Sequence, residues 1–345
     1  MVVLRQPLRR TVIVIGGALL FLIAYWTKAR HQSSIGWRIR PRVAKVTMLY
    51  GKPNALYERA IRSHQRHAKH WGYPMHVLRE DIAVGFWNKP SYLFSLIVRE
   101  LTKPAPSRME WLMWVDADSI IVNEVIPVEI FLPPSDLTDI HLVAGRDQNG
   151  LNTGVFSLHV HPWTVSMLAE TLGYPSYRPE VDLSRSADQE AMARVLNKRE
   201  GGPDGQGYKD GVVYLPRPWI NAYGWLHGYE GQKRSLLVHF PGLEDQRWEH
   251  MARWLDAVEA YPAQWRVPLE ETWYLNETTH FWTGIRHAKR PVAAAEEELR
   301  YSNPANRTKL EEELQELRTA IREITDTPEL LLQQIDELDA VREFN

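Results

Sequence analysis

The residues with the clearest chemical potential are two aspartates one position apart, Asp116 and Asp118, with Ala117 between them. They follow the apolar run 112–115, which is typical of a buried strand, and ligand sites in open α/β sheets lie where strands end. Two carboxylates this close repel each other, and a cation between them stabilises both ionised forms. Oxygen ligands of this kind suit Mn²⁺ or Mg²⁺. The same pattern also fits a solvent-exposed turn, because Asp is a common turn residue.

A third metal ligand is available in His239, within the stretch LLVHFPG. Like the aspartate pair, it follows a short apolar strand and leads into a turn. A single histidine in this setting is also compatible with a hydrogen-bonded core residue.

Two further polar segments have both a structural and a functional interpretation. The segment from Ser186 to Gln189 (SADQ) matches a capping box, in which Ser186 is the N-cap residue and Gln189 lies at the third helical position. In the functional interpretation, Asp188 and Gln189 instead face a pocket from a helix N-terminus. The loop 149–154 (NGLNTG) is either a simple turn or a place where backbone approaches a ligand closely.

The elements that position these residues alternate between strand and helix. We expect strands at 44–50, 75–78 and 111–122, the last interrupted by the aspartate turn, and helices at 54–71 and 90–101. This order predicts an α/β fold with a mostly parallel sheet. Later strands are expected at 141–144, 155–159, 212–215 and 236–239, and later helices at 162–172, 188–196 and 248–260.

The C-terminal segment has a different pattern. From about residue 291 the chain is rich in Glu, Leu and Arg, and apolar residues alternate spacings of four and three from Leu310 to Ile324. The pattern resumes after Pro328. It is typical of a coiled-coil seam and predicts either a helical hairpin or self-association of the chain into an oligomer. Because the heptads follow the last candidate site residue, we expect this segment to be dispensable for chemistry.

The bulk composition excludes some classes of function. The chain has 345 residues, a net charge of −2 and no cysteine. The charge balance gives no basic field for nucleic acid, and the absence of cysteine excludes disulfides and thiolate-bound metal. The 14 Trp residues are compatible with a core or with the flat faces of sugar rings.

The N-terminus contains an apolar run, 12–26, preceded by three arginines. Its 15 residues would span roughly 22 Å as a helix, enough for a thin membrane, and a cleaved signal peptide is the alternative. We expect a cytosolic tail (1–10), a transmembrane signal anchor (11–27) and a stem (28–42). Basic residues on both sides leave the orientation open, whereas sequons at Asn276 and Asn306 favour a lumenal C-terminal body.

Taken in order, these motifs resemble glycosyltransferase family 34, which contains fungal Golgi α-galactosyl- and α-mannosyltransferases and plant xyloglucan xylosyltransferases. The stretches that carry the resemblance are FWNKPSYL (86–93), WLMWVDADSIIVN (111–123), DQNGLNTGVFSLHVHPWTVSML (147–168), SADQEAM (186–192), WINAYG (219–224) and HFPG (239–242). They cover roughly residues 43–260.

The resemblance implies a GT-A fold over 43–290, followed by a helical extension over 291–345. It also implies a single-pass type II Golgi membrane protein with a lumenal catalytic domain, and a retaining, Mn²⁺-dependent hexosyl transfer to a glycan or glycoprotein acceptor. Metal binding would fall to Asp116, Asp118 and His239, and the donor sugar would lie beside Asp188 and Gln189. We expect the remaining donor contacts from Tyr50, Gly51, Lys89, Ala117, Asn152, Gly154 and Gly242.

Some features depart from the family pattern. Ala187 stands where the plant enzymes have a second aspartate, and their phosphate-binding lysine shortly after HFxG has no match, because Glu244 and Asp245 stand there. Arg247 is then the candidate for neutralising the leaving diphosphate. These departures argue against xylosyl transfer and leave UDP-galactose or GDP-mannose as the expected donor. The alternative functions are a non-catalytic, nucleotide-sugar-binding subunit of a Golgi complex and a metal-dependent phosphoesterase.

Overall fold

The structure is a computed structural model, and it describes residues 42–343 except 184–185, 199, 203–204, 206, 226, 302–303 and 325–327. The predicted tail and anchor, and all but the last residue of the predicted stem, lie outside the described residues. None of the helices within the described part combines the length and the apolar character that a bilayer crossing requires.

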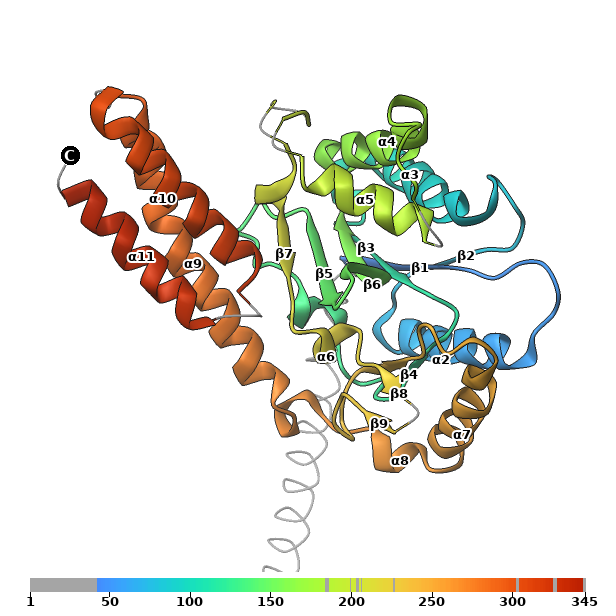
Figure 1. Cartoon of the computed structure of the whole chain (residues 1–345). Coiled ribbons are helices and arrows are strands. Elements are labelled where there is room, and N and C mark those ends of the chain that lie inside the picture. The colour runs from blue at the N-terminus through green and yellow to red at the C-terminus, as the bar shows by residue number, and fades with distance from the viewer. Residues whose placement is uncertain are drawn as a thin grey trace, which may run out of the picture. The chain divides into compact units, whose positions relative to one another are not determined.

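The centre of the molecule is a six-stranded sheet with the order β2-β1-β3-β6-β5-β7 (Figure 1). Its strands are β1 (Val43–Met48), β2 (Met75–Leu78), β3 (Trp111–Val115), β5 (Leu142–Asp147), β6 (Gly150–His159) and β7 (Val212–Tyr214). Only β6 runs against its neighbours in this sheet, since β1 is parallel to β2 and β3, and β5 is parallel to β7. The predicted mixed α/β fold with a mostly parallel sheet is therefore confirmed.

Helices cover both faces of this sheet. The helices of the central region are α2 (Ala55–Trp71), α3 (Asn88–Leu101), α4 (Pro162–Tyr177), α5 (Ala187–Leu196), α6 (Arg217–Ile220), α7 (Arg247–Ala260) and α8 (Pro262–Trp265). Figure 1 shows α3, α4 and α5 on one side of the sheet and α2 on the other. The first group packs on Leu112, Trp114 and Phe156, which point to that face because side chains alternate along a strand.

Helix α2 shows how local sequence sets an element's limits. Asn54 caps its start, with the side-chain oxygen accepting from the backbone N–H groups of Leu56 and Tyr57. Gly72 ends it in the left-handed conformation at φ 75°, which glycine adopts without steric cost. Both limits agree with the predicted helix.

The strand that follows the aspartate turn leaves the main sheet. β4 (Ser119–Ile121) pairs antiparallel with β10 (Leu237–His239) in a separate two-stranded sheet, which packs against α7 through Ile120, Val238 and Met251. The other short elements are the hairpin β8 (Gly224–Trp225) and β9 (Gly228–Tyr229), and the 3-10 turns η1 (Gly85–Trp87), η2 (Ala105–Ser107), η3 (Val128–Phe131), η4 (Lys209–Gly211), η5 (Glu244–Gln246) and η6 (Leu269–Glu271).

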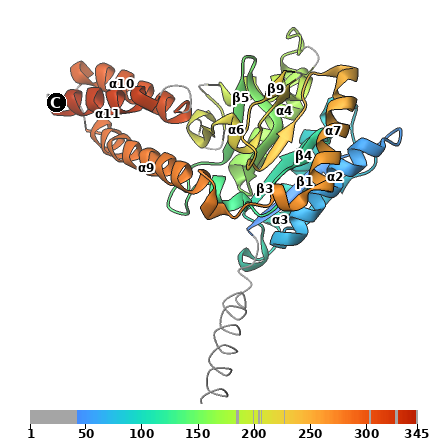
Figure 2. The ribbon, with the colours of Figure 1, turned by 90° about the horizontal axis from the view of Figure 1, so that it is seen from below.

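The C-terminal segment folds as three packed helices beside the sheet (Figure 2). They are α9 (Tyr274–Leu299), α10 (Pro304–Arg322) and α11 (Pro328–Glu343), so the predicted domain boundary at residue 290 falls inside α9. The heptad residues are buried within this one chain: Leu310, Leu314, Leu317, Ile321, Ile324, Leu331, Ile335 and Leu338. The hairpin alternative therefore describes the segment, and an oligomer formed through the same seam is not supported, because its apolar positions already pack against α9.

Candidate active site

The turn between β3 and β4 presents Asp116 and Asp118, and backbone contacts fix its shape. The Asp116 N–H donates to the Gly154 carbonyl at 2.8 Å. The Asp116 carbonyl accepts from the Ser119 N–H at 3.1 Å and from its hydroxyl at 2.6 Å. The turn is thus tied to β6 on one side and closed on itself on the other.

A buried basic cluster supports this turn from beneath. Because the Ser119 hydroxyl donates to Asp116, it accepts from His64 Nε2 at 3.1 Å. His64 Nδ1 then accepts from Lys45 Nζ at 2.9 Å, and His67 Nδ1 lies 3.0 Å from the same ammonium. Complete burial lowers the pKa of Lys45 well below its usual value. The cluster fixes where β4 begins and hence where the second aspartate points.

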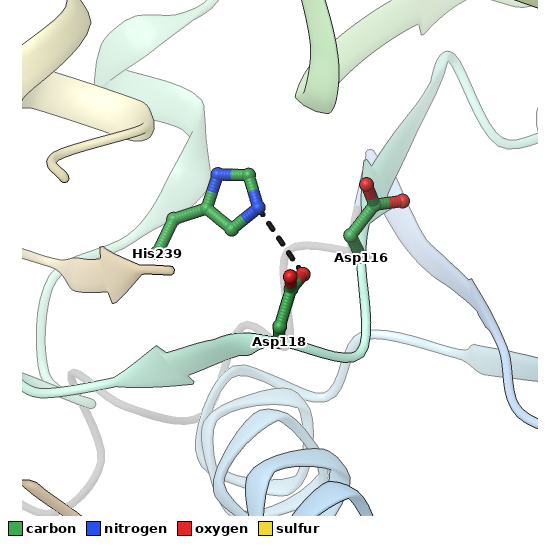
Figure 3. Close-up of side chains that lie close together, drawn as sticks. All are labelled: Asp116, Asp118 and His239. Carbon is green, nitrogen blue, oxygen red and sulfur yellow. Dashed lines mark hydrogen bonds and ion pairs between the residues drawn. The ribbon is translucent and has the colours of Figure 1, made fainter. Parts of the chain in front are cut away.

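The pairing of β4 with β10 brings the predicted third ligand to the turn. His239 lies opposite Ser119 in this pair, and its Nε2 lies 3.2 Å from Asp118 Oδ1. One ligand atom from each of Asp116, Asp118 and His239 can be chosen so that all three lie within 4.8 Å of one another (Figure 3). The structure therefore brings together the three residues predicted to hold a metal.

A chain of hydrogen bonds determines which nitrogen of His239 carries a proton. Asn152 Oδ1 accepts from the Gly154 N–H at 2.9 Å, while Asn152 Nδ2 donates to the Asp147 carboxylate at 3.1 Å. These two partners set the orientation of the Asn152 amide, because a backbone N–H only donates and a carboxylate only accepts.

The chain continues through a second amide. Asn221 Nδ2 donates to Asn152 Oδ1 at 2.8 Å, so Asn221 Oδ1 faces His239 Nδ1 at 2.7 Å and accepts its proton. His239 Nε2 is left to face the Asp118 carboxylate. Two lone pairs at 3.2 Å require a positive charge between them, either a proton or a metal ion. This arrangement fits a divalent cation, because a histidine ligand oriented through its other nitrogen is usual at metal sites and the two carboxylates add oxygen ligands.

The two aspartates have different electrostatic surroundings. Burial raises the pKa of Asp116, and the Asp118 charge adds to the rise against the opposing effect of Lys89. Burial also acts to raise the pKa of Asp118, but His239 and Arg247 outweigh it and hold that pKa below the usual value. Arg247 Nη1 lies 3.0 Å from Asp118 Oδ2 and also donates to the Tyr57 hydroxyl at 3.0 Å.

Lys89 connects the aspartate turn to helix α5. Its ammonium lies 3.4 Å from Asp116 Oδ1 and 3.3 Å from Asp188 Oδ2, and it donates to the Thr153 carbonyl at 3.0 Å. The side chain is buried, and its Nζ lies 5.4 Å from the centre of the Trp114 ring. Lys89, a predicted donor contact, therefore lies at the junction of the two predicted acidic sites.

The capping-box interpretation of Ser186–Gln189 is wrong. Ser186 is the N-cap residue of α5 by position, but its side chain makes no capping hydrogen bond. The Gln189 carbonyl oxygen instead accepts from the Thr153 N–H at 2.9 Å and from its hydroxyl at 3.2 Å. Asp188 is buried, and no hydrogen bond within the described residues reaches its Oδ2. Gln189 thus contacts β6 and Asp188 contacts Lys89, and their role beside a donor sugar stays a prediction.

The remaining predicted residues differ in what the structure shows of them. Gly154 is required by contact, because a Cβ there would come within 2.3 Å of His239 Cε1. Gly51 and Gly242 adopt φ angles of 86° and 69° with open space around them. The Tyr50 hydroxyl accepts from Asn88 Nδ2 at 2.9 Å, and Ala117 lies between the two aspartates in the turn.

Three residues of the site were missed from the sequence, namely Asn221, Asp147 and Tyr57. The first two lie inside the stretches WINAYG and DQNGLNTGVF, where polar residues within otherwise apolar or glycine-rich motifs were the available signal. Tyr57 lies on the first turn of α2 and has no comparable signal, because it reaches the site only through Arg247.

Comparison with known proteins gives structural likenesses only. No protein-family model matches this sequence, and no curated protein matches it. Among solved structures, it is similar to a glycosyltransferase involved in the glycosylation of the major capsid of PBCV-1, with 18% identity and a TM-score of 0.49 over 62% of this chain and 100% of that chain. It is also similar to the glycosyltransferase GlyE of Streptococcus pneumoniae TIGR4, with 14% identity and a TM-score of 0.37 over 66% of each chain. Similarity at this level does not assign a reaction, which has to be judged from the residues.

Proposed function

We propose that this chain is a metal-dependent glycosyltransferase that moves a hexose from a nucleotide sugar to a glycan acceptor. The observation that carries the proposal is the partly buried cluster of Asp116, Asp118 and His239, in which the hydrogen bond to Asn221 directs His239 Nε2 toward Asp118. A divalent cation held by these three side chains would neutralise the negative charge of a leaving diphosphate.

The residues around the cluster suit a diphosphate leaving group. Arg247 is the nearest cation to Asp118 on the side opposite His239, and its side chain is 22% exposed. It can therefore turn from the carboxylate to a phosphate oxygen without leaving the site. Gly242 and Gly51 have no side chains that would hinder a nucleotide, and both occupy backbone conformations that favour glycine.

Helix α5 supplies the groups for the sugar. Asp188 Oδ2 is a buried acceptor whose partner within the described part of the chain is the Lys89 ammonium at 3.3 Å, and because a carboxylate oxygen has two lone pairs it can also accept from a ligand hydroxyl. Its carboxylate, with its charge offset by Lys89, either attacks the anomeric carbon or stabilises the positive charge that develops there. Gln189 accepts from β6, which holds the first turn of the helix in position. Retention follows in the first case because the diphosphate leaves as the Asp188–sugar bond forms and the acceptor then displaces Asp188, and in the second case if the acceptor attacks from the face that the diphosphate leaves.

The finer assignments rest on the resemblance to glycosyltransferase family 34. They include galactose or mannose as the transferred sugar, Mn²⁺ as the cation, and a Golgi membrane location with the anchor at 11–27. We include them in the proposal together with a glycoprotein acceptor. The sequon residue Asn276 is exposed at the start of α9, which is compatible with a lumenal body.

A donor screen tests the proposal. Purified protein with Mn²⁺ should release nucleotide from UDP-galactose or GDP-mannose, and chelation with EDTA should stop the release. Asp116→Ala should reduce nucleotide release by about 10²-fold or more. The substitution removes one ligand of the proposed cation, whose charge would stabilise the leaving diphosphate. Asp256→Ala is the matched control, since Asp256 is an exposed aspartate paired with Arg59 far from the turn. Full release in EDTA would refute metal dependence. Metal-bound donor without any turnover would favour the non-catalytic subunit.

A further inference from the structure

A polar cavity of about 530 Å³ lies between helix α5 and the turn that joins β5 to β6. We refer to it as the α5 pocket. Its walls come from α5, from the turn between β5 and β6, from β7 and from the end of α10. The residues that matter here are Arg146, Arg194, Asn197, Lys198, Tyr214 and Glu323. Its volume lies within the usual range for small-molecule sites.

The lining of the pocket lies close in sequence to Gln189 and Thr153. Ala193 lines it and follows Gln189 by four residues on the same face of α5, which is about 6 Å along the helix. Leu151 lines it and precedes Thr153 by two residues on the same side of β6, which is about 7 Å along the strand. The pocket therefore begins within about one sugar ring of Gln189 and Thr153, which contact each other.

Four cationic side chains and two carboxylates line the pocket, and two further carboxylates outside the lining complete the ion pairs. Each cationic side chain that lines it is paired with a carboxylate: Arg146 with Glu323 at 3.3 Å, Arg178 with Glu180 at 2.6 Å, Arg194 with Glu190 at 2.6 Å, and Lys198 with Glu170 at 2.7 Å. A site for a phosphate or a carboxylate would present unmatched positive charge. Paired Arg, Glu and Asn side chains instead offer donors and acceptors side by side, which matches the neighbouring hydroxyls of a neutral sugar.

The C-terminal helices complete this pocket. Glu323, directly after α10, lies 3.3 Å from Arg146 of β5, whose guanidinium also stacks 5.1 Å from the centre of the Tyr214 ring. The preceding residue, Arg322, reaches Asn197 at the end of α5 at 3.5 Å. The segment that lies outside the family resemblance thus forms one wall of a cavity beside the proposed active site.

We infer that the α5 pocket is the acceptor subsite, that it binds a neutral oligosaccharide, and that the C-terminal bundle contributes to acceptor recognition through Glu323. The role of acceptor in this inference rests on the proposed glycosyltransferase function. The binding of a neutral sugar in this pocket can be measured without any transfer.

Two pairs of variants of the full-length protein test it. Arg194→Trp fills the pocket, and Arg253→Trp is its control because Arg253 is likewise an exposed helical arginine paired four residues back with a glutamate. Glu323→Ala removes the carboxylate from the pocket wall, and Glu296→Ala is its control because Glu296 pairs with Arg318 in the same bundle. Saturation-transfer NMR would give the dissociation constants of α-linked mannobiose, α-linked galactobiose, cellotetraose and a mannose phosphate. Melting temperatures would confirm folding.

We expect at least one neutral oligosaccharide to bind the unmutated protein better than the mannose phosphate does. Arg194→Trp should abolish that binding, and Glu323→Ala should weaken it about tenfold, as expected for the loss of a charged hydrogen-bond partner. Both controls should stay within about twofold of the unmutated protein, since distant surface changes have small effects.

Preferred binding of the sugar phosphate, equal losses in the controls, or no oligosaccharide binding at all would overturn the inference. Nucleotide release from the donor, measured on the unmutated protein alone, separates this result from the proposed function. Release without oligosaccharide binding refutes the pocket only. Oligosaccharide binding without release refutes the transferase.

Discussion

Replacing Asp118 with Asn should remove metal binding while leaving the fold almost unchanged. In the metal-free protein, Asp118 Oδ1 faces His239 Nε2 at 3.2 Å with a proton between them, and Oδ2 accepts from Arg247 at 3.0 Å. An amide of the same shape can make both contacts, because its NH₂ group donates to Nε2 and its oxygen accepts from Arg247. The Phe240 N–H bonds to the backbone carbonyl of residue 118, which the substitution does not alter.

The expected magnitudes differ strongly between the two conditions. In EDTA, the variant exchanges charged hydrogen bonds for neutral ones at a partly accessible site, so its unfolding free energy should change by no more than about 1 kcal/mol. With Mn²⁺ at a hundred times its dissociation constant, the unmutated protein should gain about 2.7 kcal/mol. That gain corresponds to a rise of roughly 4 °C in Tm for a domain of this size. The variant lacks one of three ligands and should show little of this rise.

Scanning calorimetry with EDTA and with Mn²⁺ gives both quantities for each protein. Asp256→Asn serves as the control, because it removes the charge of an exposed, arginine-paired aspartate and should keep the full response to Mn²⁺. An unchanged Mn²⁺ response in Asp118→Asn would show that the metal does not bind at this turn. A loss of several kcal/mol in EDTA would show that Asp118 is mainly a structural residue.

Three further outcomes follow from the described contacts. Asn221→Ala should lower Mn²⁺ affinity by about 10–100-fold, as loss of a partner behind a metal ligand does; titration calorimetry measures this, and unchanged affinity would mean that His239 is oriented by something else. Leu314→Ala should cost about 2–5 kcal/mol in urea unfolding, because this fully packed residue leaves a cavity between α9 and α10; a cost below about 1 kcal/mol would mean that the bundle unfolds separately. Burial lowers the pKa of His141 to about 3 and that of His159 to about 4. The unfolded chain therefore binds protons at a higher pH than the folded chain, and the free energy of unfolding should fall as the pH drops from about 6.5 toward 4. The loss should be about 1–2 kcal/mol for each histidine at pH 5. Urea titrations at several pH values should show less of this fall in His159→Gln, and an equal fall would contradict the assignment.

Much of the fold could be predicted because its elements have strong local signals. The run 111–115 is apolar throughout and buried on both faces, and Asn54 and Gly72 mark the limits of α2. The order of the strands had no such signal. The reversal of β6 and the departure of β4 from the main sheet depend on pairings such as Ser119 with His239, which join residues far apart in sequence.

The candidate site was likewise predictable where a local sequence signal exists. Asp116 and Asp118 directly follow an apolar strand, so the sequence alone indicates both their chemistry and their place at the end of that strand. Asn221 has no local feature that distinguishes it from a loop asparagine, and its role depends on a chain of contacts that spans 69 residues to Asn152. The capping-box pattern at Ser186 was misleading because it considers only neighbours in sequence. In the structure the Gln189 side-chain oxygen accepts from the Thr153 N–H, which is distant in sequence.

The expectation that the C-terminal segment is dispensable is not supported by its contacts. A heptad pattern determines how helices pack against one another, but it contains no information about what the ends of the helices touch. Glu323 and Arg322 lie at such an end, and they contact β5 and α5 beside the proposed active site. Deleting the segment would remove a wall of the α5 pocket and expose the apolar face of α9.

The charges of the site bear on the order in which the proposed cation and nucleotide sugar would bind. Asp116, Asp118 and Asp188 contribute three negative charges, against the two positive charges of Lys89 and Arg247. These five side chains together carry one net negative charge, and a divalent cation held by Asp116, Asp118 and His239 would change the total to +1. At an effective dielectric constant near 20, one unit charge 4 Å from another is worth about 4 kcal/mol. The negative site would repel a diphosphate, whereas a site that held the cation would attract it. Under the proposed function, we therefore expect the metal to bind before the nucleotide sugar.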